Sequence, residues 1–237
     1  MNIILLRADD HWLSHAAVRL CDHRADHIRV LLKASVGDKL RVGCISGRHG
    51  TGTVQSIDAD AVTLSLELNQ EPSPRHRFDV VLALPRPKML RRIFRTVAEF
   101  GVAHLHLINS ARVEKSYWQT PLLAAHRMEE ALIAGMERSR DTISPQVHLH
   151  RRFRPFIEDD LASICSGRPC WITEPGAPIA LADVPVGDAV VMVGPEGGFV
   201  PFELELARLH GARPAHLGHR ILSVDTALTT ALAHGQH

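Results

Sequence analysis

The feature that most constrains the fold is an alternation of apolar strands and amphipathic helices that begins near residue 78. Residues 79–84 read DVVLAL, and residues 88–100 then place apolar side chains at helical spacing. Further strand candidates lie at 103–109, 170–174, 188–194 and 215–218, and further helix candidates at 121–138, 201–210 and 223–234. Because strands that alternate with helices usually pair in parallel, we expect an α/β fold with a mainly parallel sheet over residues 78–237.

The position of a binding site follows from that expectation. In an open parallel sheet, ligands bind in the crevice beyond the carboxyl ends of the strands. The loops to examine are therefore those that follow Leu84, Glu174, Gly194 and Gly218.

The first part of the chain has a different pattern. Residues 1–70 contain short alternating runs at 39–44, 51–56 and 61–68, separated by glycine turns, with one helix candidate at about 25–33. Residues 71–77 read EPSPRHR, which has two prolines and no periodicity and is typical of a linker. We therefore predict a small β-rich domain, a linker and an α/β domain.

Composition narrows the class of protein. Of the 237 residues, 45% are hydrophobic and 22% are charged, as in soluble proteins with a substantial core. No apolar run reaches the roughly 18 residues that a membrane span needs, and the start MNIILLRADDHW is too short and too acidic for a signal peptide. The four cysteines form no CxxC pair, so we expect a reduced, cytoplasmic enzyme without a membrane partner.

Positive charge is concentrated locally although the net charge is only +1. Residues 86–95 carry five basic side chains and no acidic one, and residues 148–154 read HLHRRFR. One such run is commonly a solvated helix face. Two runs make a phosphate-binding surface more credible, because a polyanion responds to local positive potential.

A glycine-rich loop, GPEGGF at 194–199, follows the strand candidate at 188–194. It matches neither the P-loop nor the GxGxxG pattern. Its glycines allow a ligand to approach the backbone closely, while Glu196 would repel a phosphate. We expect a ligand that is neutral or positive beside Glu196, although a simple tight turn stays an alternative.

A second segment, HLGHRILSVDTALTTAL at 216–232, combines a glycine turn, Arg220 and an acidic residue directly before a helix. Asp225 and Thr226 stand where a helix cap would lie, so capping is the alternative to a role in chemistry. GPEGGF followed by LGxRIL resembles the RsmE family of 16S ribosomal RNA uridine N3-methyltransferases, within the knotted SPOUT superfamily. Residues 25–40 and 85–102 also resemble that family.

The resemblance implies an architecture and a cofactor. The C-terminal domain would be a SPOUT trefoil-knot methyltransferase domain, an exception to the general absence of knots, and residues 1–70 a PUA-like β-barrel that helps to hold RNA. S-adenosyl-L-methionine would bind in the knot. The protein would form a homodimer through the knotted domain, with ribosomal RNA of the small ribosomal subunit as its partner. The implied cofactor-binding residues are Leu84, Thr173, Glu174, Val193, Gly194, Pro195, Glu196, Gly197, Gly198, Leu217, Gly218, Ile221, Leu222, Ser223 and Thr226.

The final motif of the family reads Arg-Ile/Val-Leu-Arg-Thr-Glu-Thr, and this chain departs from it. Ser223 replaces the second arginine, Val224 the threonine and Asp225 the glutamate. We expect Arg220 and Asp225 to be the catalytic residues, with Glu196 as an alternative proton acceptor. Arg91, Arg92 or Arg138 could supply the charge that Ser223 lacks.

The resemblance also implies an RNA-binding side, on which most departures fall. Its candidates are Arg86, Lys88, Arg91, Arg92, Arg95, Arg138 and Arg140. A different RNA target, or RNA binding without catalysis, therefore stays open. No metal site is expected, because Cys21, His23 and His27 lack a matching second ligand set, and His104 and His106 fit edge or core positions of a strand.

Overall fold

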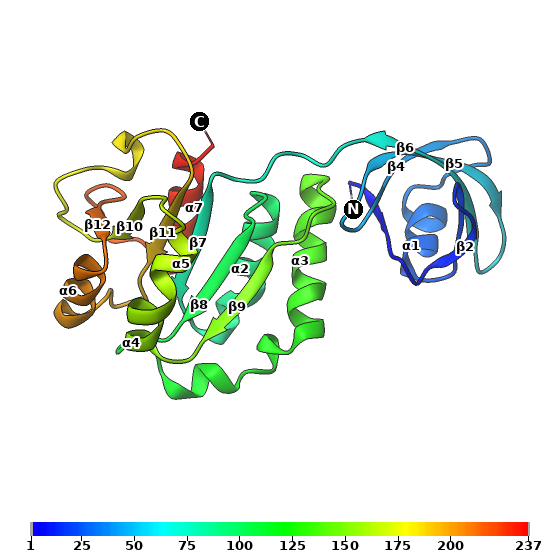
Figure 1. Cartoon of the computed structure of the whole chain (residues 1–237). Helices are drawn as coiled ribbons and strands as arrows, with labels where there is room; N and C mark the ends of the chain where they lie inside the picture. Colours follow the sequence, from blue (N-terminus) through cyan, green and yellow to red (C-terminus); the bar gives the residue numbers. More distant parts are fainter. Residues whose placement is uncertain (1, 237) are drawn as a thin grey trace. The chain divides into compact units, whose positions relative to one another are not determined.

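The computed structural model describes residues 2–236 and divides the chain into two compact units (Figure 1). The first comprises residues 1–74 and 133–144, and the second comprises residues 75–132 and 145–237. The division falls inside the segment 71–77, which forms no helix or strand. Residues 133–144 join the first unit through contacts such as the hydrogen bond from the Asn2 backbone N–H to the Glu137 carbonyl at 2.9 Å.

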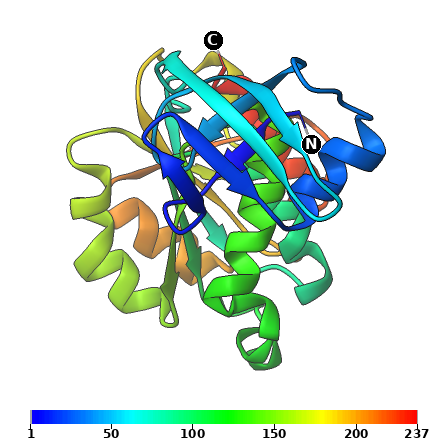
Figure 2. The same ribbon diagram turned by 90° about the vertical axis from the view of Figure 1, so that its right-hand side faces the viewer.

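The first unit contains a curled six-stranded sheet, whose blue and cyan strands face the viewer in Figure 2. Its strand order is β1 (Ile4–Leu6), β4 (Lys39–Cys44), β5 (His49–Ile57), β6 (Val62–Gln70), β3 (Ala17–Leu20) and β2 (His11–Ser14). Only β1 and β4 pair in parallel. The strands predicted near 39–44, 51–56 and 61–68 are confirmed, whereas β1, β2 and β3 are too short for their pattern to stand out.

A short helical segment closes the core of this unit. It starts as α1 (His23–Asp26) and continues as a π-helix over His27–Leu31. Ala25 and Ile28 pack against apolar side chains from the sheet, including Val42 and Leu64. The helix predicted at about 25–33 is therefore present, two residues displaced and partly in π geometry.

An ion cluster ties the start of this helix to the sheet. Arg24 is buried, and its guanidinium donates to Asp10 at 2.8 Å and to Asp22 at 2.7 Å. A third hydrogen bond of 2.7 Å goes to the carbonyl of Leu5 in β1. Burial opposes the charge of Arg24, but its two carboxylate partners raise its pKa above the ordinary value.

The second unit is built on a six-stranded sheet in which every pairing is parallel. Its order is β12 (Ala212–Ala215), β10 (Cys170–Thr173), β11 (Ala189–Val193), β7 (Phe78–Ala83), β8 (His104–Ile108) and β9 (Gln146–His150). The predicted parallel sheet is confirmed. The strand predicted at 215–218 is wrong in position, since β12 ends at Ala215. Strand β9 was not predicted because its QVHLH sequence is too polar.

Helices of the second unit surround this sheet, as Figure 1 shows. They are α2 (Pro87–Glu99), α4 (Phe153–Pro155), a π-helix at Phe156–Asp160, α5 (Leu161–Cys165), α6 (Pro201–Leu209) and α7 (Val224–His234), with 3₁₀ turns at Lys115–Gln119, Pro121–Leu123 and Leu181–Asp183. Helix α3 (Ala125–Ser139) begins in the second unit, and its residues from 133 onward belong to the first. The face of α2 that carries Leu90, Ile93 and Val97 is buried, and α2 contacts α7. Within residues 2–236, the helices are too short or too polar to cross a bilayer.

Candidate functional site

A cavity of about 430 Å³ opens beyond the carboxyl ends of β10, β11 and β12. The loops that follow Glu174, Gly194 and Gly218 meet there, as expected for ligands of a parallel sheet. Its volume lies within the roughly 300–1,000 Å³ that small-molecule sites occupy. The lining residues are Thr173, Glu174, Pro175, Val193, Gly194, Pro195, Glu196, Gly197, Gly198, Phe199, Leu204, Leu217, Gly218, Arg220, Ile221, Leu222, Val224 and Ala227.

Most of the predicted cofactor-binding residues lie in this lining. Leu84, Ser223 and Thr226 do not. Leu84 is fully buried at the end of β7, and its backbone N–H donates to the carbonyl of Ile108 at 2.9 Å. The lining residues Pro175, Phe199, Leu204, Val224 and Ala227 were not predicted, because only the folded chain brings them to the cavity.

Glycines in the two cavity walls are required either by close packing or by a positive φ. A Cβ added at Gly194 would lie 3.2 Å from the Phe199 ring, so the loop is closely packed there. Gly198 has φ +74° and Gly218, in the opposite wall, has φ +116°. These backbone conformations are strained for residues that carry a side chain.

Glu196 links the glycine-rich loop to the start of α2. Its Oε1 accepts a hydrogen bond of 3.3 Å from the Arg86 backbone N–H and lies 3.8 Å from the Arg86 Nε. Arg112 also reaches this loop and donates to the carbonyl of Gly197. The loop is therefore held by two separate side-chain contacts.

The end of this loop is held by the buried carboxylate of Glu203, which the sequence did not single out. Glu203 is 3% exposed, and its Oε1 accepts from the Ala111 backbone N–H at 2.7 Å. Its Oε2 accepts from the Ser110 hydroxyl at 3.1 Å and from the Val200 backbone N–H at 3.0 Å. The available signal was the position of Glu203 three residues after the N-cap Val200, with Pro201 as the first residue of α6.

The opposite wall is an irregular segment between β12 and α7 (residues 217–223). Within the described part of the chain, the backbone N–H groups of Leu217, Ile221 and Leu222 have no protein acceptor. Free backbone groups beside apolar side chains suit a flat heteroaromatic ring such as adenine. Glu196 in the lining suits a positively charged sulfonium, whereas the Glu174 carboxylate is already paired with Arg208. The residues present therefore fit S-adenosylmethionine.

The two predicted catalytic residues lie near one another in sequence but differ in their surroundings. Arg220 lines the cavity, is exposed, and has no hydrogen-bond or ion-pair partner among residues 2–236. Asp225 lies in the first turn of α7, where Ser223 is the helix cap. Asp225 is therefore not the capping residue by position, and its carboxylate interacts with side chains and also with the backbone N–H groups of Asp225 and Thr226.

Both carboxylate oxygens of Asp225 are engaged. The Ser223 hydroxyl donates to Oδ1 at 2.6 Å, and Arg92 Nη1 of α2 donates to Oδ2 at 2.8 Å. The Ser223 hydroxyl also lies 2.9 Å from that of Thr226. The hydrogen bond from Ser223, followed by that from Arg92, holds the pKa of Asp225 below its ordinary value.

The predicted RNA-binding residues fall on two separate units. Arg86, Lys88, Arg91 and Arg92 are exposed at the amino-terminal half of α2, while Arg95 is half-buried. Arg138 lies in the last turn of α3, and Arg140 comes directly after that helix with φ +64°. Both belong to the first unit.

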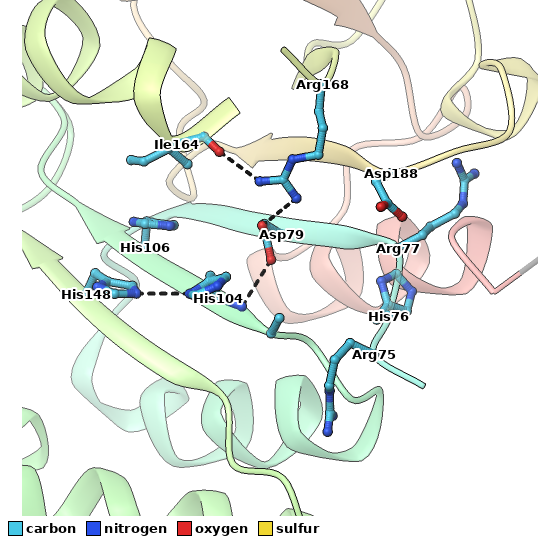
Figure 3. A pocket seen from close by; sticks show the side chains of 11 residues that line it. Arg75, His76, Arg77, Asp79, His104, His106, His148, Ile164, Arg168 and Asp188 are labelled. Carbon is cyan, nitrogen blue, oxygen red and sulfur yellow. Dashed lines mark hydrogen bonds and ion pairs between the residues drawn. The ribbon is translucent and has the colours of Figure 1, made fainter. Parts of the chain in front are cut away.

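A second cavity, of about 480 Å³, lies around the amino-terminal ends of β7, β8 and β11 (Figure 3). Asp79 accepts from Arg168 Nη1 at 2.7 Å, and the rings of His104 and His148 are joined by a hydrogen bond of 3.3 Å. His106 stacks on His148 with ring centroids 4.5 Å apart. No cluster in residues 2–236 has the geometry to hold a metal ion.

His106 in this second cavity is held in its neutral form. Burial, together with the charges that His148 and His150 would carry, lowers the pKa of His106 to about 3. His106 is buried and His104 is half-buried, which agrees with their expected edge or core positions in a strand.

A family model described as an RNA methyltransferase domain matches residues 71–236. One relative is a ribosomal RNA small subunit methyltransferase E from Treponema pallidum, 26% identical, with 98% of this chain and 90% of the relative covered. Another protein of that name, from a Synechocystis species, is 28% identical, with 92% and 72% covered.

A solved structure supports the fold. It is a ribosomal RNA small subunit methyltransferase E from Neisseria gonorrhoeae bound to S-adenosyl methionine, with a TM-score of 0.76 at 21% identity. The match covers 98% of this chain and 95% of that protein. The fold of this chain is that of the solved methyltransferase, and the resemblance to the RsmE family is confirmed. Since the family model covers more than half of the chain, this protein belongs to the RNA methyltransferase domain family.

Proposed function

We propose that this protein transfers the methyl group of S-adenosylmethionine to N3 of a uridine in 16S ribosomal RNA of the small subunit. The observation that carries this proposal is the meeting of the GPEGGF loop and residues 217–222 around one cavity. Relatives named ribosomal RNA small subunit methyltransferase E support the substrate. The solved relative bound to S-adenosyl methionine supports the cofactor.

The residues of the cavity suit this reaction. When bound, S-adenosylmethionine supplies an electrophilic methyl group on a positively charged sulfur. Loss of the weakly acidic uridine N3 proton leaves negative charge on the ring, and the unpaired Arg220 is suited to stabilise it. Asp225 and Glu196 are the two candidate proton acceptors.

A homodimer through the second unit and a cytoplasmic location are part of the proposal. Ile221 lines the cavity, yet 90% of it is exposed in the single chain. An exposed aliphatic side chain at a binding site favours coverage by a ligand or by a second subunit. The basic side chains of α2 and of residues 138–140 would contact RNA phosphates.

The first experiment is isothermal titration of the purified protein with S-adenosylmethionine and S-adenosylhomocysteine. We expect both to bind the wild-type protein, and the absence of binding would disprove the cofactor assignment. The second experiment is mass spectrometry of nucleosides from small-subunit ribosomal RNA of cells that lack the gene. We expect 3-methyluridine to be lost, to return with the wild-type chain, and to stay absent with Arg220→Ala.

A further inference from the structure

The pairing of Arg92 with Asp225 joins two helices that are far apart in sequence. Arg92 lies on α2 and Asp225 in the first turn of α7, and the Nη1 to Oδ2 distance is 2.8 Å. The Asp225 side chain is only 16% exposed, whereas that of Arg92 is 70% exposed. The carboxylate is therefore the fixed end of the pair, and the guanidinium is the end that reaches solvent.

The Asp225 carboxylate is orientated by residues at the start of its own helix, α7. Ser223 holds Asp225 Oδ1 at 2.6 Å, which leaves Oδ2 to hold Arg92. The free N–H groups at the start of α7 favour the negative charge of this carboxylate. With both oxygens engaged, Asp225 is suited to hold a cation in place and poorly suited to take up a proton.

The exposed guanidinium of Arg92 retains hydrogen-bond donors that Asp225 does not use. A guanidinium carries five N–H groups, and within residues 2–236 the only recorded acceptor for Arg92 is Asp225. Val224 and Ala227, on either side of Asp225 in α7, line the cofactor cavity. Arg92 does not itself line the cavity, but Asp225 joins it to the turn of α7 that does, and within residues 2–236 its remaining donors have no other protein acceptor.

We propose that Arg92 is a catalytic residue that contacts the deprotonated uracil ring of the substrate, and that Asp225 and Ser223 are the positioning residues that hold it. This inference rests on the proposed function. It explains why the final motif tolerates Ser223 in place of arginine: the cation comes from α2, and the serine hydroxyl orientates the carboxylate that anchors it.

The uridine N3 proton passes to Glu196, the candidate acceptor that is left when Asp225 is engaged by Ser223 and Arg92. Arg92 donates to a ring oxygen that takes up the negative charge. The N3 electron pair forms a bond to the methyl carbon while the carbon–sulfur bond breaks. Its electron pair stays on sulfur, which leaves S-adenosylhomocysteine and 3-methyluridine.

The test is the pH dependence of methyl transfer by the full-length protein to small ribosomal subunits that lack the modification. We expect Arg92→Ala to reduce kcat about 100-fold near neutral pH, as for loss of one donor to a developing anion. The loss should shrink as pH rises, because uridine then ionises without help. Arg92→Lys should recover part of kcat.

Three comparison variants distinguish a catalytic role of Arg92 from a general effect of charge. Arg91→Ala removes an exposed charge from the same helix without touching Asp225, so it should raise KM for the subunit and leave the pH profile in place. Arg127→Ala breaks an exposed ion pair with Glu130 on α3 and should behave as wild type. Asp225→Asn combined with Arg92→Ala should cost no more than Arg92→Ala alone.

Binding of S-adenosylmethionine distinguishes a failure of the role proposed for Arg92 from a failure of the proposed function. If the wild-type protein binds the cofactor and methylates the subunit, but Arg92→Ala keeps its kcat at every pH, the role of Arg92 is disproved. A change confined to KM and to its salt dependence would also overturn it, because Arg92 would then contact a phosphate. If the wild-type protein neither binds the cofactor nor methylates the subunit, the proposed function itself has failed.

Discussion

The buried carboxylate of Glu203 accepts a hydrogen bond from the backbone N–H of Ala111 at 2.7 Å. This contact joins α6 to the loop that follows β8, and the same carboxylate holds the Val200 N–H beside the glycine-rich loop. One side chain thus sets the geometry of a cavity wall that it does not itself line.

Glu203→Gln should therefore weaken both stability and cofactor binding. The amide nitrogen would face a donor instead of accepting from it, and a buried unsatisfied group costs about 1–3 kcal/mol. We expect a lower urea midpoint and weaker binding of S-adenosylmethionine by titration. Glu205→Gln on the exposed side of the same helix is the control. Equal behaviour of the two variants would contradict the role of Glu203.

Gly218→Ala should weaken cofactor binding through backbone strain. Its φ of +116° is unfavourable for alanine, although no atom within 4 Å would block a Cβ. We expect a stability loss of about 1–2 kcal/mol together with a reduced affinity for S-adenosylmethionine. Gly211→Ala, at φ +92° and outside the cavity lining, should lose stability and keep the affinity. Retained affinity in Gly218→Ala would show that the loop is not rigid when it binds.

Stability should fall as pH decreases below about 6.5, the ordinary pKa of histidine. The pKa of His106 is about 3 in the folded protein, so the unfolded chain binds more protons between these values. The stabilisation is complete above pH 6.5 and is lost progressively toward pH 3. Urea midpoints across this range measure it. His106→Gln should flatten the slope, and His126→Gln, at an exposed position on α3, should not.

Arg24→Ala should destabilise the first unit strongly. The substitution leaves Asp10 buried without its cation, and breaking a buried pair typically costs about 3–5 kcal/mol. Arg19→Ala removes an exposed pair with Asp58 and should change stability by less than about 1 kcal/mol. Thermal unfolding of the two variants gives the comparison, and a small effect at Arg24 would mean that the cluster contributes no net stability.

The parallel sheet and the cavity loops could be predicted because their signals are local. Apolar runs predicted β7, β10 and β11, and the glycines of residues 194–198 indicated the loop that follows β11. Strand β9 could not be predicted, since its sequence is polar and its histidines are half-buried against those of β8 only in the folded chain. Strands β1 to β3 were not predicted because they are too short for a pattern to stand out.

The sequence by itself determined the α/β pattern, the two motifs and the family that they resemble, because these depend on residues close together in the chain. Three features depend on tertiary structure alone. Glu203 accepts a hydrogen bond from Ala111, residues 133–144 pack with the first unit, and Arg92 donates to Asp225. The last pair is separated by 133 positions. A hydrogen bond over that separation forms only after the sheet has brought α2 and α7 together, so no local pattern records it.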